Sequence, residues 1–173
     1  MQNLNYGVIG NCSTAALISE KGAIEWLCFP EFDSPSVFAA ILDRQKGGHF
    51  GFKVTSDYKV TQSYVPHTNI LSTHFESEEG AFDVVDFMPC YPTSDGKDFY
   101  RPAEIYRYIR WAKGRPRMKV DYRPAPNYAR GKTIYNVTSQ YVETYSSAKN
   151  KDRQYLYSSL DLKKVVNHDE ITL

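Results

Sequence analysis

The sequence is first informative for the chemistry that it lacks. Its 173 residues include only three cysteines, Cys12, Cys28 and Cys90, and none of them lies in a CxxC motif. A zinc site is therefore not expected, and we interpret the cysteines as small buried residues in a reducing compartment. The sequence also has no Gly-x-Ser-x-Gly nucleophile motif and no glycine-rich phosphate loop. We accordingly expect no cofactor and no metal ion.

The sequence also lacks the charge and hydropathy patterns of nucleic-acid and membrane proteins. Its formal net charge is +1, whereas general nucleic-acid or membrane-surface binders usually carry a strong basic bias. No charged-then-apolar leader opens it, and no run approaches the roughly 18 apolar residues of a membrane span. These absences predict a cytoplasmic protein that binds neither nucleic acid nor membrane.

What the sequence does contain is alternation. Apolar or aromatic residues recur at alternate positions in three segments, 58–64, 105–111 and 117–123, interrupted only by Gln62 in the first and Arg107 in the second. A period of two is typical of half-buried antiparallel strands. Short turn signals that end in glycine recur along the chain, as in Glu20–Gly22 and Glu78–Gly80. We therefore predict an all-β domain spanning residues 1–173, a large antiparallel β-sandwich (a supersandwich) with one short helix.

Only one segment favours a helix. Residues 36–44 follow a proline that suits a first turn, and four of them form an apolar stripe at helical spacing: Val37, Phe38, Ile41 and Leu42. Two longer loops, 90–102 and 124–132, interrupt the strands and are candidates for functional contacts. Thr172 and Leu173 resemble the start of another strand, so we expect the sequence to end inside a longer protein.

Several segments carry a resemblance to a known family. The most specific are YGVIGNCSTAALIS (Tyr6–Ser19) and GAIEWLCFPEFDSPSVFAAIL (Gly22–Leu42), and the others, in the same order, are GGHFGFKV (Gly47–Val54), Tyr64–Pro89 and PNYAR (Pro126–Arg130). Together they resemble the N-terminal domain of bacterial glucoamylase-like and trehalase-like enzymes of glycoside hydrolase family 15. Asn11 stands where that family usually has Asp, Ser13 where it often has Arg, and Ala129 where it usually has Gly. Because alanine does not accept a positive φ as glycine does, the backbone at position 129 is expected to differ.

The resemblance implies a β-sandwich that is followed by a helical linker and a catalytic (α/α)6 barrel. Such enzymes hydrolyse α-glucosidic bonds, in starch-derived oligosaccharides or in trehalose, with inversion of configuration. Both catalytic carboxylates of the family lie in barrel motifs that this sequence does not contain. The chain is therefore expected to have no catalytic residue and to pack on the barrel, through which the parent protein would bind an α-glucan or trehalose.

The acidic residues of the sequence agree with a non-catalytic domain. Inverting hydrolysis needs two carboxyl groups roughly 6.5–9.5 Å apart on opposite sides of one glycosidic bond. Asp83 and Asp86 are three residues apart in a predicted strand, so their side chains point to opposite faces. Glu31 and Asp33 can face the same way, but the residues around them have a simpler interpretation as a turn.

Two loops hold the candidate contact residues. The barrel-facing or substrate-side candidates are Phe32, Asp33, Ser34, Pro35 and Ser36 in the first loop, and Asn127, Tyr128 and Arg130 in the second. Trp111, at the end of a predicted strand, is a candidate for stacking on a sugar ring, although edge packing is an equally simple role for it. Two alternatives stay open, a stand-alone carbohydrate-binding module and a structural domain that forms homo-oligomers.

Overall fold

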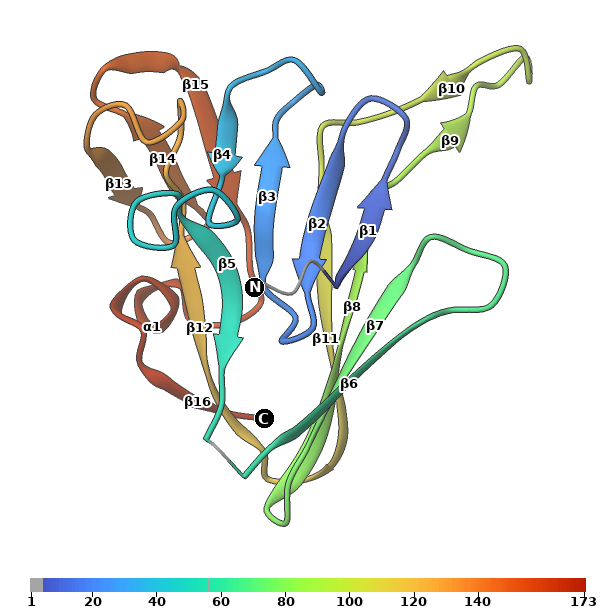
Figure 1. Ribbon diagram of the computed structural model, residues 1–173, viewed down its shortest axis with the longest axis vertical. Helices are drawn as coiled ribbons and strands as arrows, with labels where there is room; N and C mark the ends of the chain where they lie inside the picture. The colour runs from blue at the N-terminus through green and yellow to red at the C-terminus, as the bar shows by residue number, and fades with distance from the viewer. Residues whose placement is uncertain (1–4, 56) are drawn as a thin grey trace.

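A computed structural model of the chain describes residues 5–55 and 57–173, without the side chains of residues 149–151. Figure 1 shows two main antiparallel sheets that face each other, with a small third sheet beside them and a separate hairpin. This arrangement confirms the all-β sandwich that the alternating pattern predicted.

The larger sheet contains seven strands in the order β1-β2-β3-β5-β12-β16, with β4 paired to β3. Their bounds are β1 (Tyr6–Gly10), β2 (Ala15–Ser19), β3 (Ile24–Cys28), β4 (Ser36–Phe38), β5 (His49–Lys53), β12 (Arg117–Arg123) and β16 (Glu170–Thr172). The second sheet has the order β11-β8-β7-β6, built from β6 (Lys59–Tyr64), β7 (Leu71–Glu76), β8 (Gly80–Phe87) and β11 (Tyr106–Gly114).

Three smaller elements complete the fold. The third sheet consists of β13 (Thr133–Val137), β14 (Val142–Ser146) and β15 (Lys149–Leu156). The hairpin consists of β9 (Tyr91–Pro92) and β10 (Phe99–Tyr100), and α1 (Leu162–Asn167) lies against β12. Within the described residues, no helix has the length and apolar composition needed to cross a membrane.

The core lies between the two main sheets. Phe75 and Phe82 of the second sheet are fully buried and stack with ring centroids 4.7 Å apart, and Phe52 of the larger sheet meets Phe75 edge-on at 6.3 Å. Along β12 the apolar side chains of Met118 and Val120 are buried, as their alternation predicted. These contacts fix which faces of the strands remain available for a site.

The helix predicted for residues 36–44 is wrong. Ser36–Phe38 instead forms β4, in which Phe38 lies opposite Leu27 of β3 and packs against Phe50 and Tyr122. The following residues make turns, closed by the hydrogen bond from the amide of Gly47 to the carbonyl of Asp43. Burial of Phe38 among aromatic rings from distant strands outweighs the local helical period.

The single helix lies elsewhere, at Leu162–Asn167. Asp161 caps it by accepting a hydrogen bond from the amide of Lys163, and His168 ends it in the left-handed conformation. Its buried side chains are Leu162 and Val165, so it covers part of the core beside β12. A six-residue helix with two valines gives too short a stripe to be recognised from periodicity.

The cysteine interpretation holds for only one residue. Cys28 is buried in β3, whereas Cys12 and Cys90 are exposed, and all three are free thiols. Cys12 sits in the turn between β1 and β2 with a φ of 70°, which places its side chain outside the core. The local turn geometry therefore overrides the usual tendency of cysteine to be buried.

Candidate functional site

The two loops chosen from the sequence lie side by side. The amide of Tyr128 donates to the carbonyl of Ser36 at 3.3 Å. The hydroxyl of Tyr128 donates to the carbonyl of Ser34, 94 residues earlier in the sequence, at 3.4 Å. The amide of Ala125 also donates to the carbonyl of Val37 at 2.9 Å. The candidate residues from both loops therefore belong to one surface.

The first loop is a tight turn held by serine. The hydroxyl of Ser34 accepts a hydrogen bond from the amide of Glu31 at 3.1 Å, and the amide of Ser34 donates to the carbonyl of Glu31 at 3.1 Å. Asp33 is exposed and makes no hydrogen bond or ion pair with the described residues. Pro35 is half-buried and Ser36 is fully buried. Ser34, rather than Asp33, thus supplies the side chain that closes the turn.

A third segment joins this surface through Asn11. Its side-chain oxygen accepts from the amides of Ser13 and Thr14 at 3.1 and 3.2 Å, which builds the turn between β1 and β2. The carbonyl of Ser13 in turn accepts from the amide of Phe32 at 3.0 Å. The side-chain nitrogen of Asn11 donates to the carbonyl of Pro102 at 3.1 Å, a bond that an ionised aspartate could not make.

The second loop has an unusual backbone. Asn127, Tyr128 and Ala129 have φ angles of 59°, 56° and 56°, so three consecutive residues other than glycine are left-handed. Each such residue costs roughly 1–2 kcal/mol and persists only where the surroundings enforce it. Ala129 thus adopts the positive φ that an alanine was expected to avoid. Arg130 is exposed and its guanidinium lies 5.7 Å from the ring of Tyr128.

We call this surface the loop edge and define it as residues 11–14, 31–36 and 125–130. Its exposed aromatic side chains are Phe32, which is 61% exposed, and Tyr128, which is 45% exposed. The segments that carry the family resemblance most specifically thus converge here. Rigid turns that present exposed rings are typical of contact surfaces rather than of a protein's own core.

The β9–β10 hairpin adds three aromatic residues next to the loop edge. Figure 1 shows it projecting from the body of the domain, and its second strand ends shortly before Pro102, to which Asn11 is bonded. Tyr91, Phe99 and Tyr100 are each half or more exposed. The sequence marked residues 90–102 only as a long loop. Aromatic residues on both sides of the Thr93–Asp98 turn are the signal that could have identified the hairpin.

Trp111 is exposed, as a stacking residue must be. Its side chain is 58% exposed, and its indole N–H donates to the carbonyl of Gly114 at 3.0 Å. That bond fixes the ring near the C-terminal end of β11, which is not part of the loop edge. Its role toward sugar stays a prediction.

The buried carboxylates are all engaged by cations. Asp86 is paired with Arg107, Asp83 with Arg110 and His74, Glu143 with Arg153, and Asp121 with His49, Lys53 and Arg123. Asp83 and Asp86 do point to opposite faces of β8, as predicted. Burial alone would raise the pKa of Asp83, but hydrogen bonds from His74 and Arg110 outweigh it and lower that pKa. An ionised, fully paired carboxylate cannot serve as a general acid.

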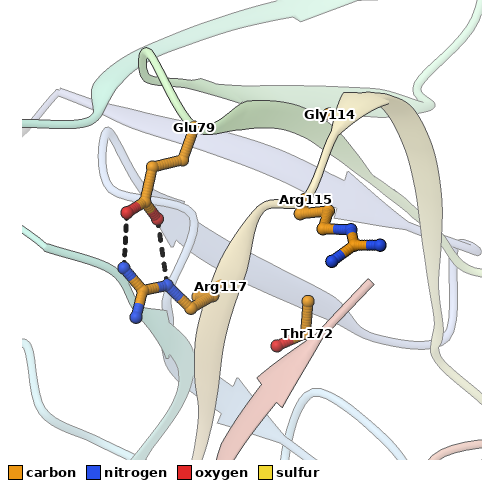
Figure 2. A pocket seen from close by; sticks show the side chains of 5 residues that line it. All are labelled: Glu79, Gly114, Arg115, Arg117 and Thr172. Carbon is orange, nitrogen blue, oxygen red and sulfur yellow. Dashed lines mark hydrogen bonds and ion pairs between the residues drawn. The ribbon is translucent and has the colours of Figure 1, made fainter.

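Two hollows of the surface lie away from the loop edge. One has a volume of about 560 Å³ and is lined in part by Glu79, Arg115 and Arg117. Glu79 and Arg117 form a bidentate ion pair there (Figure 2). A second, lined in part by Tyr6 and Tyr64, lies along the edge of β1. Neither contains a candidate residue. Among residues 5–55 and 57–173, no cluster of His, Cys, Asp and Glu is arranged to hold a metal ion.

Comparison with known proteins places these features in a family context. A family model described as "Trehalase-like, N-terminal" matches residues 5–150. The chain is 36% identical to the "Trehalase" of Thermoplasma volcanium over 132 residues, which cover 75% of the chain and 20% of that protein. It is 32% identical to the "Trehalase" of Thermoplasma acidophilum over 155 residues, 88% of the chain and 26% of that protein.

A further relative is more similar over a shorter segment. The chain is 51% identical to the "Trehalase 1" of Sulfolobus acidocaldarius over 85 residues, 48% of the chain and 14% of that protein. The chain thus spans about a quarter or less of the length of these three relatives. No solved structure shows a significant match.

Proposed function

Because the chain belongs to the family of trehalase-like N-terminal domains, we propose that it is the non-catalytic N-terminal part of an α-glucoside hydrolase. The catalytic (α/α)6 barrel would lie in the remaining length, of which the relatives have about three quarters or more. The names of these relatives favour trehalose over starch-derived oligosaccharides as the substrate of the parent protein, which would hydrolyse it with inversion. The cytoplasm is the proposed compartment, since three free thiols are stable where the environment is reducing.

We propose that the loop edge, together with the β9–β10 hairpin, is the surface that packs on the barrel. The observation that supports this most directly is the convergence of three rigid turns that expose Phe32 and Tyr128. The hairpin supplies a second argument, because an isolated two-stranded hairpin is marginally stable in water. Its exposed rings would be buried by a partner domain.

The surroundings of the carboxylates in the described part of the chain support inertness of the chain alone. Glu31 and Asp33 are exposed on a turn and line neither of the two hollows described above, while the buried carboxylates are each paired with a lysine or arginine. We expect the isolated chain to give no turnover of trehalose or maltose above buffer. Measurable glucose release that persists through repeated purification would contradict the proposal that this domain is non-catalytic.

The docking role needs the parent protein, expressed from its full reading frame. The double variant Phe32→Ser/Tyr128→Ala is expected to lower the melting temperature of the barrel and to reduce hydrolysis, because two anchors of the contact are lost. The matched control is Leu42→Ala, since Leu42 is 74% exposed and lies outside the loop edge. Equal behaviour of the double variant and the control would refute the docking surface.

A further inference from the structure

The outer face of the second sheet is a separate surface that the proposed function does not use. On β11 the side chains of Tyr106, Tyr108 and Arg110 point outward, whereas Arg107 and Ile109 point into the core. Tyr106 and Tyr108 are 45% and 62% exposed. We call the outward side chains of β11, β8 and β7 the outer face.

The aromatic half of the outer face is held in position. Tyr106 lies opposite Phe87 of β8, and the two rings stack with centroids 5.1 Å apart and planes inclined by 7°. The hydroxyl of Tyr106 donates to Glu104 at 3.0 Å. Tyr108 lies opposite Val85, and it makes no ring contact or hydrogen bond with the described residues. The rings of Tyr106 and Tyr108 therefore present two flat apolar surfaces about 7 Å apart along the strand.

The next row of the same face is polar and equally fixed. Arg110, Asp83 and His74 lie opposite one another on β11, β8 and β7. Asp83 accepts two hydrogen bonds from Arg110, at 3.0 and 2.8 Å, and one of 2.7 Å from His74. The guanidinium remains 60% exposed, so its other N–H groups face outward. Planar charged groups thus stand directly beside the aromatic rings.

This combination suits a sugar better than a protein surface. An apolar protein face laid across the sheet would desolvate Arg110 and Asp83 without new hydrogen bonds, which is costly. A sugar offers both features at once, an apolar C–H face for the rings of Tyr106 and Tyr108 and hydroxyls for the polar row. Two linked rings are long enough to cover both tyrosines.

We propose that the outer face, centred on Tyr108, binds a gluco-oligosaccharide of two or more rings. The choice of glucose rests on the proposed function of the parent protein, whereas the site itself rests on the geometry of the face. The surface would hold substrate or glucan near the enzyme without taking part in hydrolysis. Because Tyr106, Arg110 and Asp83 are already held by their partners, only Tyr108 needs to be ordered when the sugar binds.

The test is titration of the isolated chain with maltoheptaose, followed by calorimetry and by amide chemical shifts. We expect saturable binding with shift changes along β11 and β8 around Tyr108. Tyr108→Ala should weaken the affinity by about tenfold or more, because one stacking surface is lost. The matched control is Trp111→Ala, since Trp111 precedes the strand's irregularity and points to the other face of β11 by alternation.

The outcomes separate this proposal from the others. No saturable change at millimolar sugar, or shift changes confined to residues outside the outer face, would overturn it. Loss of binding in Trp111→Ala with retention in Tyr108→Ala would overturn it too, and would assign stacking to Trp111 instead. Neither result touches docking on the barrel, which depends on the loop edge and is measured in the parent protein.

Discussion

Arg107 of β11 and Asp86 of β8, which lie opposite each other in the second sheet, form a bidentate ion pair on the face that meets the larger sheet, at 2.8 and 3.1 Å, with side chains only 4% and 0% exposed. The guanidinium also lies over the rings of Phe50 and Phe52, at 4.7 and 4.9 Å, and donates to the carbonyls of Phe50 in β5 and of Gly22 in the turn between β2 and β3. One side chain of β11 thus ties both layers of the sandwich together, and its cost of burial is offset by these hydrogen bonds and ring contacts.

Replacing Arg107 by a neutral residue should destabilise the protein strongly. Arg107→Met keeps much of the apolar stem but leaves the carboxylate of Asp86 buried and unpaired, so we expect the free energy of unfolding to fall by about 3–5 kcal/mol. Arg110→Met is the control, because the side chain of Arg110 is 60% exposed and His74 still pairs with Asp83 when Arg110 is removed, so this change should cost about 1 kcal/mol or less. Urea denaturation measures both, and equal losses would show that the pair between the sheets has no special weight.

Asp121 should make the stability of the fold depend on pH in the acidic range. Burial alone would raise the pKa of this carboxyl, but hydrogen bonds from His49, Arg123 and Lys53 outweigh it and hold the pKa far below its ordinary value of 3.8. Since the folded pKa is the lower one, Asp121 stabilises the fold above about pH 4 and loses this contribution as the pH falls toward its folded pKa.

The comparison of wild type with Asp121→Asn tests that statement. At neutral pH the variant should be less stable by a few kcal/mol, because Lys53 and Arg123 lose their buried counter-charge and His49 loses its carboxylate partner. The gap between the two proteins should narrow steadily as the solution is acidified from about pH 4 to about pH 2. A gap that stays constant over this range would exclude Asp121 as the source of acid sensitivity.

Position 11 should require an amide side chain and not a carboxylate. Asn11→Asp keeps the two bonds accepted from Ser13 and Thr14 but places a carboxylate against the carbonyl of Pro102. Because this site is only 2% exposed, we expect a loss of roughly 1–3 kcal/mol. Hydrogen exchange should also quicken near the base of the β9–β10 hairpin. Unchanged exchange there would mean that the bond to Pro102 does not anchor the hairpin.

The strands were predictable from sequence because alternation reports directly which side chains are buried. Segments 58–64, 105–111 and 117–123 each overlap an observed strand, β6, β11 and β12. The segment 36–44 was misread because its apolar residues fit a helical stripe equally well, and only contacts with β3 and β12 decide between the two. Such long-range contacts carry no local signal.

In the candidate site, too, the local features were predictable from sequence and the long-range contacts were not. Its two loops were identified from their residues, but their contact through Tyr128 and Ser36 depends on how β4 and β12 are placed in the larger sheet. The link from Asn11 to Pro102 joins positions 91 residues apart and could not be inferred from either segment alone. The outer face was missed because alternation predicts that Tyr106 and Tyr108 share a face, not that the face is left uncovered.

The last prediction concerns the left-handed turn of the loop edge. Ala129 has a φ of 56°, a conformation in which its Cβ is strained by roughly 1–2 kcal/mol, whereas glycine carries no such strain. Glycine also loses more chain entropy on folding, which offsets part of the gain. We therefore expect Ala129→Gly to stabilise the protein by up to about 1 kcal/mol, measured by urea denaturation.

The same exchange at a neighbouring alanine supplies the control. Ala125 lies in the same loop, outside the set of positive-φ residues, and is buried. Ala125→Gly should therefore cost about 0.5–1 kcal/mol, since it adds chain entropy and relieves no strain. Opposite signs at the two positions would establish that residues 127–129 are held in a strained turn. Equal destabilisation would mean that the turn is not left-handed at Ala129 in solution.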